Sequence, residues 1–323
     1  MRAIRVDRFG PPEVLEPVVL PEREPGPGEV SVAVAASDVG FVDTMIRSGA
    51  GTSFFAIRPP YVPGGGVAGQ IVGAGDGVDG SLIGRLVVAH TGGTGGYAER
   101  VVIALSEVVE VPPGVDPLDA LAVLHDGSTG IAVLRRVDVR SGEPVLVLGA
   151  AGGMGVLLVQ ALHAAGAFVI GAARGKAKLD VVEEAGADVV VDYGKPEWTS
   201  RVRDATNAAG PAVVLDGVGG SLGSEAFTMV RDGGRFSAHG APSGTFAPID
   251  PDVARRRGVT LITLADLGID ATTRSPLVRE ALALVGAGAL TPLIGQTFPL
   301  GSASEAHRAM ENRESIAKTL LMN

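Results

Sequence analysis

The stretch PVLVLGAAGGMG, residues 144–155, decides the fold of this chain. It begins with a four-residue apolar run, 145–148, which is short enough for a strand buried on both faces. A glycine cluster follows, and from Met154 onward the apolar positions 157, 158, 161 and 162 have helical spacing. Strand, glycine-rich turn and helix in this order are typical of dinucleotide binding, because the backbone can approach a pyrophosphate at the helix N-terminus. The stretch therefore predicts a nucleotide cofactor.

The glycine fingerprint departs from the usual G-x-G-x-x-G at its first position, where Ala150 precedes Gly152 and Gly155. A glycine-rich turn by itself is also compatible with plain turn chemistry. The continuation of the unit favours the nucleotide, because a second apolar strand, 168–172, follows at the right distance.

The end of that second strand indicates which nucleotide is bound. A site for NAD places an acidic residue there, about 20 residues beyond the glycines, to bind the ribose 2′-hydroxyl. Ala173 occupies this place, and Arg174, Lys176 and Lys178 follow it. These cations suit a 2′-phosphate and predict NADPH, the alternative being a solvated basic start of a helix.

Composition limits the class of protein. A chain of 323 residues predicts two domains. Its net charge of −9, with no basic run beyond residues 255–257, disfavours a nucleic-acid partner. The apolar stretches are interrupted before the roughly 18–20 residues that a membrane span needs, and the N-terminus lacks a signal-peptide core. We expect a cytoplasmic protein without a membrane partner.

Metal chemistry is disfavoured by the residues themselves. The chain contains no cysteine, which removes disulfides, thiolate nucleophiles and every cysteine-bearing metal site. Its five histidines, at 90, 125, 163, 239 and 307, show no paired metal-ligand spacing. We therefore expect no metal.

The pattern of secondary structure changes near residue 120. Before it, short β-type segments at 30–36, 69–72, 86–89 and 97–103 are divided by Gly, Pro and Asp, as in a small β-rich barrel. After it, predicted strands alternate with predicted helices, which is typical of an α/β fold with a doubly wound parallel sheet. The strands are expected at about 145–149, 168–172, 188–192, 212–216 and 234–238, and the helices at about 153–165, 176–185, 197–208 and 221–231.

Several motifs in order along the chain resemble one family. They are MRAIRVDRFGPPEVLE at 1–16, PGPGEV at 25–30, VDTMIRSG at 42–49, GGYAE at 95–99, GAAGGMG at 149–155, LDGVGG at 215–220 and ENRESIAKTLL at 311–321. In these motifs the chain is similar to the zinc-free quinone oxidoreductase branch of the medium-chain dehydrogenase/reductase superfamily. The resemblance implies a discontinuous GroES-like β-rich catalytic domain, 1–120 and 270–323, and a Rossmann NADPH-binding domain, 121–269. It also implies NADPH in the cleft between the domains and a homodimer.

The resemblance assigns cofactor contacts position by position. The pyrophosphate turn would be formed by Ala150, Gly152, Gly153 and Met154, and the 2′-phosphate would be bound by Arg174, Lys178 and Tyr193. The adenosine, ribose and nicotinamide would be lined by loops after the later strands and by the helix joining the domains, at Val218, His239, Gly240, Ala241, Leu264 and Thr129.

The positions that hold catalytic zinc in related alcohol dehydrogenases are Gly40, Gly65 and Gly66 in this chain. Without a Lewis acid to stabilise an alkoxide, hydride delivery to an already polarised acceptor is favoured over alcohol oxidation. The acceptor is then a quinone or an alkene conjugated with a carbonyl. Asp43 of the family's segment remains and is a candidate catalytic residue. We expect the acceptor pocket to be lined by Gly40, Phe41, Phe54, Phe55 and Tyr61.

The segment HDGST, 125–129, has two polar residues where relatives place apolar ones. His125 could protonate a developing oxyanion near neutral pH, with Asp126 orienting it. The alternative is a helix N-cap formed by Asp126 or Ser128.

Three functions stay open on the sequence. The first is an NADPH-dependent, zinc-independent reductase of quinones or activated alkenes. The second is a reductase of enoyl thioesters carried by CoA or a carrier protein, although the tyrosine that such enzymes use has no clear match. The third is a non-catalytic NADPH-binding protein with a structural or sensory role.

Overall fold

The computed structural model describes residues 1–53 and 55–323. Its contacts divide the chain into two compact units. Unit 1 comprises Met1–His125 and Val278–Asn323, and unit 2 comprises Asp126–Leu277. Phe54, expected in the acceptor pocket, lies outside the described residues.

Unit 2 contains a six-stranded sheet in which all paired strands are parallel. The strand order is β10-β9-β8-β11-β12-β13, so the order reverses beside β8. This is the doubly wound order in which ligands bind at the carboxyl ends of the strands, next to the reversal. The strands are β8 (Pro144–Leu148), β9 (Phe168–Ala173), β10 (Val189–Asp192), β11 (Val213–Asp216), β12 (Arg235–Ala238) and β13 (Thr260–Thr263).

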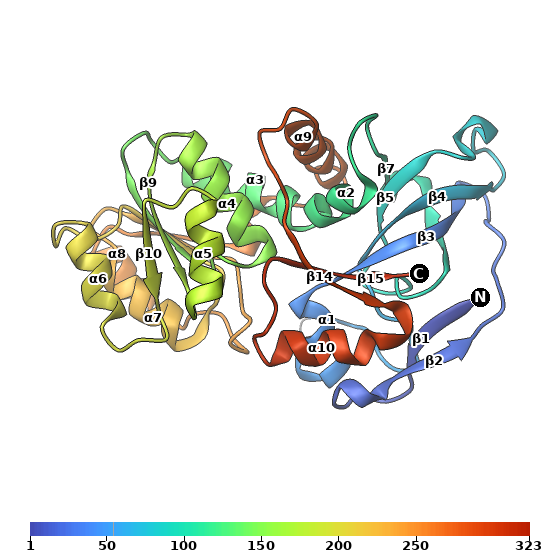
Figure 1. Ribbon diagram of the computed structural model, residues 1–323, viewed down its shortest axis with the longest axis horizontal. Coiled ribbons are helices and arrows are strands. Elements are labelled where there is room, and N and C mark those ends of the chain that lie inside the picture. Colours follow the sequence, from blue (N-terminus) through green and yellow to red (C-terminus); the bar gives the residue numbers. More distant parts are fainter. Residues whose placement is uncertain (54) are drawn as a thin grey trace. The chain divides into compact units, whose positions relative to one another are not determined.

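Helices cover both faces of this sheet (Figure 1). One face packs against Val133, Leu158 and Val182, which come from α3 (Asp126–Val137), α4 (Gly153–Ala164) and α5 (Lys176–Glu184). The other face packs against Trp198, Phe227 and Ala254, which come from α6 (Trp198–Ala205), α7 (Gly220–Met229) and α8 (Pro251–Arg256). Strands buried on both sides explain why the sequence shows continuous apolar runs there.

The predicted α/β fold is confirmed. Each of the five strands expected after residue 120 begins and ends within one residue of an observed strand, from β8 to β12. The four expected helices correspond to α4, α5, α6 and α7.

Unit 1 is built on a seven-stranded sheet with the path β14-β15-β3-β4-β5-β7, and β6 pairs with β3 off this path. A separate antiparallel pair joins β1 (Arg2–Val6) to β2 (Leu15–Val19). The strands of the larger sheet are β3 (Glu29–Val39), β4 (Gly66–Ala74), β5 (Leu86–His90), β6 (Arg100–Ala104), β7 (Val108–Glu110), β14 (Ile294–Pro299) and β15 (Lys318–Met322).

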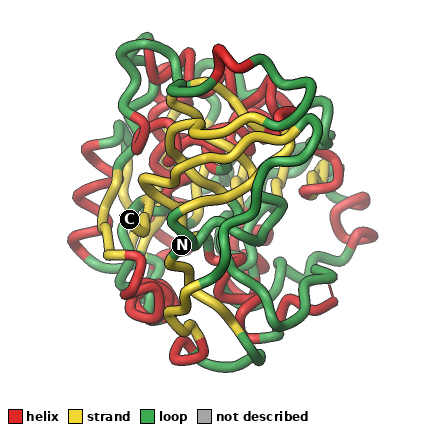
Figure 2. Tube along the Cα trace, turned by 90° about the vertical axis from the view of Figure 1, so that its right-hand side faces the viewer, coloured by secondary structure: helices red, strands yellow, loops and turns green. Residues whose placement is uncertain are grey.

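The C-terminal segment belongs to the sheet of unit 1. β15 runs antiparallel to β3, with Leu320 opposite Asp38 and Thr319 opposite Val39. Figure 2 shows the strands in yellow and marks both chain ends, which lie in this unit. This pairing brings Lys318 close to Asp38, although 280 positions separate them in the sequence.

The helices of unit 1 are α1 (Phe41–Ser48), α2 (Pro117–Leu124) and α10 (Ala303–Glu311), and α9 (Arg274–Gly286) belongs to it from Val278 onward. The short 3-10 turns of the chain are η1 (Pro12–Val14), η2 (Ala50–Ser53), η3 (Gly80–Leu82), η4 (Leu105–Glu107), η5 (Leu264–Leu267) and η6 (Leu300–Ser302). In the part of the chain that the structure describes, no helix is both long and apolar enough to span a membrane.

Candidate active site

The turn after β8 has the geometry of a nucleotide-binding turn. Gly149 adopts a positive φ of 71°, and its carbonyl accepts a hydrogen bond from Gly152 N–H at 2.9 Å. A Cβ at Gly155 would lie 2.3 Å from that carbonyl oxygen, so only glycine allows α4 to approach the turn this closely. Gly152 caps α4, whose first N–H groups have no partner within the helix and therefore face outward from its N-terminus. These features fit the pyrophosphate of a dinucleotide.

The cations after β9 are not equivalent. Lys176 forms an ion pair with Asp180 one turn later, at 2.8 Å. Arg174 is exposed, and its guanidinium lies 5.9 Å from the centre of the Tyr193 ring. Lys178 lies in the first turn of α5 and is half-buried. Arg174 and Lys178 thus come from the loop and the helix start that follow β9, and Tyr193 follows the neighbouring strand β10.

The remaining cofactor candidates also follow the sheet. Tyr193, His239 and Leu264 come directly after β10, β12 and β13, and Val218 comes two residues after β11. These residues therefore follow the same carboxyl edge of the sheet as the glycine turn. Gly240 and Ala241 continue the loop after β12. Thr129 instead lies in the first turns of α3 and is half-buried.

Two buried side chains shape the loops of this edge. Asp216 accepts hydrogen bonds from the N–H groups of Val218 and Gly219, at 2.9 and 2.8 Å. His239 lies with Nδ1 3.1 Å from Ser237 Oγ, and burial lowers its pKa to about 4. The imidazole is therefore neutral at physiological pH.

Unit 1 contains a chain of polar contacts centred on His125, the residue that ends α2. His125 Nδ1 lies 2.8 Å from Asp38 Oδ2, and His125 Nε2 lies 2.9 Å from His90 Nδ1. On the far side of the carboxylate, Lys318 Nζ donates to Asp38 Oδ2 at 3.0 Å. Four residues from β15, β3, α2 and β5 thus form one chain, Lys318–Asp38–His125–His90.

Electrostatics fix the charge of Asp38. Burial alone would raise the pKa of this carboxyl, but Lys318 and His125 outweigh burial and hold it well below the usual range. An ionised carboxylate can only accept hydrogen bonds, so His125 Nδ1 must be the donor. Asp38 therefore fixes the tautomer of His125 in the way that a carboxylate orients a catalytic histidine.

The two carboxylates named as catalytic candidates from the sequence, Asp126 and Asp43, lie at the starts of helices. Asp126 is the first residue of α3, and the carboxylate seen against the ring of His125 is Asp38. Asp43 lies in the first turn of α1 and accepts the N–H of Gly40 at 2.7 Å. Burial, reinforced by the charge of Asp38, raises the pKa of Asp43 to about 7.

Gly65 and Gly66 lie next to the ring of His125. A Cβ at Gly66 would lie 2.8 Å from both Asp38 Oδ1 and His125 Cε1, so no side chain fits there. A Cβ at Gly65 would meet His125 Cε1 and Nε2 at 3.6 and 3.7 Å, which is ordinary contact. The segment is fixed by Thr91, whose N–H and Oγ1 donate to the carbonyls of Gly65 and Gly64.

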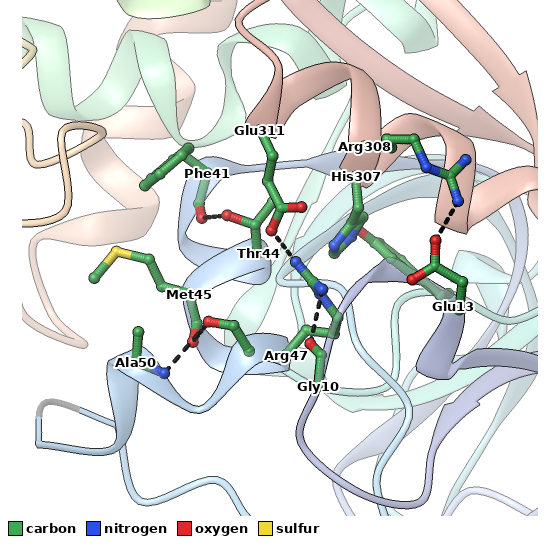
Figure 3. Close-up of polar contacts among 12 residues, drawn as sticks. Gly10, Glu13, Phe41, Thr44, Met45, Arg47, Ala50, His307, Arg308 and Glu311 are labelled. Carbon is green, nitrogen blue, oxygen red and sulfur yellow. Dashed lines mark hydrogen bonds and ion pairs between the residues drawn. The ribbon is translucent and has the colours of Figure 1, made fainter.

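The expected acceptor-pocket residues surround the start of α1. Gly40 caps this helix and Phe41 is its first residue, with the Phe41 carbonyl accepting from Thr44 Oγ1 at 2.7 Å (Figure 3). Phe55 is half-buried after η2. Tyr61 packs against the core of unit 1, and burial raises the pKa of its hydroxyl to about 12.

The other side of α1 is anchored in the protein interior. Arg47, with 1% of its side chain exposed, donates to the Gly10 carbonyl and pairs with Glu311 of α10 (Figure 3). Nearby, His307 Nε2 lies 3.0 Å from the Tyr97 hydroxyl, and burial lowers the pKa of His307 to about 3. These contacts hold α1, and with it Gly40 and Phe41, in place.

Binding of a metal ion would need a cluster of His, Cys, Asp or Glu side chains. Across residues 1–53 and 55–323, the structure places no group of three or more His, Cys, Asp or Glu side chains where they could hold a metal ion.

Comparisons with known proteins agree with both units. The alcohol dehydrogenase GroES-like domain family matches residues 26–113, and the zinc-binding dehydrogenase family matches residues 153–267. A quinone oxidoreductase of Pseudomonas aeruginosa is 31% identical over 99% of each chain. A 2-haloacrylate reductase of a Burkholderia species is 30% identical over 92% of each chain.

Two solved structures that resemble this chain are complexes with NADPH. The structure of Escherichia coli quinone oxidoreductase complexed with NADPH superposes over the full length of both chains with a TM-score of 0.92, at 25% identity. A mycobacterial protein complexed with NADPH has a TM-score of 0.90 at 31% identity, again over both full chains. Fold, nucleotide turn and relatives together define an NADPH-dependent oxidoreductase. The chain belongs to the quinone oxidoreductase family of the medium-chain dehydrogenase/reductase superfamily.

Proposed function

We propose that this protein transfers hydride from NADPH to a quinone or to an alkene conjugated with a carbonyl group, without a metal ion. Bound NADPH supplies the hydride, and the protein holds the acceptor in reach of it. The protein's own groups then bind the acceptor, exclude water and manage one proton.

The observation that carries this proposal is the presence of glycines at positions 65 and 66, next to His125. In related alcohol dehydrogenases the matched positions hold zinc ligands, whereas here Gly66 has no room for any side chain beside Asp38 and His125. A site with an imidazole in place of ligand side chains favours an acceptor that is already polarised. The names of two relatives, a quinone oxidoreductase and a 2-haloacrylate reductase, support the same two acceptor classes.

The residue assignments form part of the proposal. NADPH would be bound by the turn from Ala150 to Met154, by Arg174, Lys178 and Tyr193, and by the loops at Val218, His239–Ala241 and Leu264, with Thr129. The acceptor would lie against Gly40, Phe41, Phe55 and Tyr61. We also propose that the protein is cytoplasmic and that it forms a homodimer. Sedimentation of the purified protein would test the dimer.

The test is stopped-flow oxidation of enzyme-bound NADPH against quinones, enones and enoyl thioesters. Rapid oxidation by quinones or enones supports the proposal. Oxidation by enoyl thioesters alone would assign the protein to thioester reduction instead. Tight NADPH binding without oxidation by any acceptor would leave a non-catalytic binding protein.

A matched pair of variants locates the reaction at the proposed site. Arg174→Gln combined with Lys178→Gln should weaken NADPH binding without changing the rate of the bound complex. Lys195→Gln, in the same unit but outside the proposed phosphate contacts, should change neither.

A further inference from the structure

We propose that Asp38 and His90 are positioning residues that act through His125, and that Gly65 leaves the space in which an acceptor oxygen reaches His125 Nε2. The inference rests on the proposed function and adds to it the identity of the proton donor and the residues that prepare it.

The contacts of His125 determine which of its nitrogens carries a hydrogen. Asp38 is buried, ionised and paired with Lys318, so the hydrogen on His125 Nδ1 stays on that nitrogen. Nε2 is then the nitrogen of His125 through which a proton can enter or leave. The carboxylate also stabilises the imidazolium that would donate this proton.

His90 contacts the other ring nitrogen of His125. Its Nδ1 lies 2.9 Å from His125 Nε2, and the two rings meet edge to face at 81°. A hydrogen bond at this distance needs one proton between the two nitrogens. When both rings are neutral, His90 donates to His125. After uptake of one more proton, His125 can donate to His90. His90 therefore holds the Nε2 edge in place in both protonation states.

The ring of His125 is partly exposed. The His125 side chain keeps 37% of its surface exposed, and Gly65 beside it is half-buried. A Cβ at Gly65 would stand at ordinary contact distance from Nε2, 3.7 Å away. A methyl group at Gly65 would therefore stand beside Nε2, and the glycine leaves this place free of a side chain, as a carbonyl oxygen needs. Such an oxygen would compete with His90 for the Nε2 hydrogen.

In the proposed step, His125 gives its Nε2 proton to the oxygen of the reduced acceptor. Hydride addition turns the conjugated acceptor into an enolate, or a quinone into a hydroquinone anion, with negative charge on oxygen. The Nε2–H bond of the His125 imidazolium breaks and an O–H bond forms. His125 is left neutral, with its hydrogen still on Nδ1 and donated to Asp38, and a proton from water restores the imidazolium.

Other charged groups face the same place and bear on its pH dependence. Lys318 of β15 offsets the charge of Asp38, and Asp43 of α1 interacts with Asp38, His125 and Lys318. Because burial raises the pKa of Asp43 to about 7, Asp43 changes charge in the range of the assay. Asp43→Asn keeps an acceptor for Gly40 N–H and removes this titration, so it serves as the background for the pH measurements.

The first test compares His90→Gln with His90→Leu. An amide can donate to or accept from His125 Nε2, whereas leucine cannot. We expect His90→Leu to lower kcat about tenfold with KM for NADPH unchanged, and His90→Gln to recover most of that loss. Equal kcat values for the two variants would contradict a positioning role for His90.

The second test addresses Asp38 with Lys318, so that no buried charge is left alone. In Asp38→Asn/Lys318→Met the ring keeps an acceptor for Nδ1 but loses the nearest negative charge. The pH profile of kcat should differ from that of the Asp43→Asn background, because the negative charge in contact with the ring has been removed. An unchanged pH profile would refute the role of Asp38. If the variant does not fold, nitrogen NMR of wild-type His125 decides the point, because a hydrogen on Nε2 and none on Nδ1 in the neutral ring would refute it as well.

The third test uses Gly65→Ala, which adds one carbon in the space beside Nε2. The protein should fold and bind NADPH normally, while kcat/KM for the acceptor falls at least tenfold. Gly80→Ala is the control, because nothing lies within 4 Å of a Cβ there. Unchanged acceptor kinetics in Gly65→Ala would refute the acceptor position.

These outcomes separate the inference from the proposed function. If wild-type protein reduces no quinone or enone, the proposed function fails, and the NMR measurement still reports the tautomer. If wild-type protein reduces them and all variants behave as wild type, only the inference fails.

Discussion

Adding one methyl group at Gly155 should separate the nucleotide turn from its helix. A Cβ there would lie 2.3 Å from the Gly149 carbonyl oxygen and 2.8 Å from the carbonyl carbon of Ala150. Both are backbone atoms in the turn, so no side-chain rotation can relieve the collision. α4 would have to move away from β8, and the N–H groups at its N-terminus would move with it.

The cost can be compared with a neighbouring glycine. Overpacking costs about 1–3 kcal/mol, and Gly155→Ala stands at the upper end because backbone must shift. Gly130 in α3 offers the matched change, since its Cβ would meet Leu158 and Met154 side chains at 3.7 Å. Gly130→Ala gains helix propensity and contacts, so we expect unit 2 to become more stable by up to about 1 kcal/mol. The same substitution in two adjacent helices should thus have opposite signs.

The assay is urea unfolding followed by the fluorescence of the single tryptophan, Trp198, which is buried in unit 2. Gly155→Ala should unfold at lower urea than wild type and Gly130→Ala at higher urea, with similar slopes. Calorimetry should also find NADPH bound at least tenfold more weakly by Gly155→Ala, and with wild-type affinity by Gly130→Ala. Equal unfolding midpoints for the two variants would refute the packing argument.

Three further predictions concern the cofactor, metal and pH. NADPH should bind at least tenfold more tightly than NADH, about 1.4 kcal/mol, because we propose Arg174 and Lys178 as contacts of the 2′-phosphate; equal dissociation constants by calorimetry would contradict this. Activity should survive exhaustive chelation, and elemental analysis that found one tightly held zinc per chain would contradict metal independence. Burial lowers the pKa of His239 to about 4 and that of His307 to about 3, so the unfolded chain takes up protons below about pH 6.5 that the folded chain does not. The free energy of unfolding should therefore fall between pH 6.5 and 4, and His307→Gln should show a smaller fall; Asp43, with its raised pKa, contributes the opposite slope in both proteins.

The sequence predicted the parts of the fold that local patterns determine. The strand, turn and helix at residues 144–164 were readable because buried parallel strands are continuous apolar runs and the turn admits only small residues. The same patterns located β9 to β12 and the helices between them. The proposed cofactor loops after β10, β11, β12 and β13 leave one edge of this sheet.

The polar chain in unit 1 could not be predicted in the same way. Asp38 comes at the end of the long strand β3, His90 ends β5, and Lys318 begins β15, and nothing in the local sequence of any of them points to the others. Their proximity comes from the sheet order, which places β3 between β15 and β4 and β4 beside β5. The sequence placed a carboxylate beside His125 by adjacency, at Asp126, whereas the contact seen in the structure comes from 87 positions away.

The glycines at 65 and 66 connect the two kinds of evidence. From the sequence they signified only missing zinc ligands, but in the structure Gly66 is the residue that admits Asp38 and His125 to the same place, since a Cβ would lie 2.8 Å from each. A side chain at position 66 would therefore require Asp38, His125 and Leu124 to shift. Because Asp38 would remain a buried, unpartnered charge if His125 and Lys318 were both lost, the identities of these residues depend on one another.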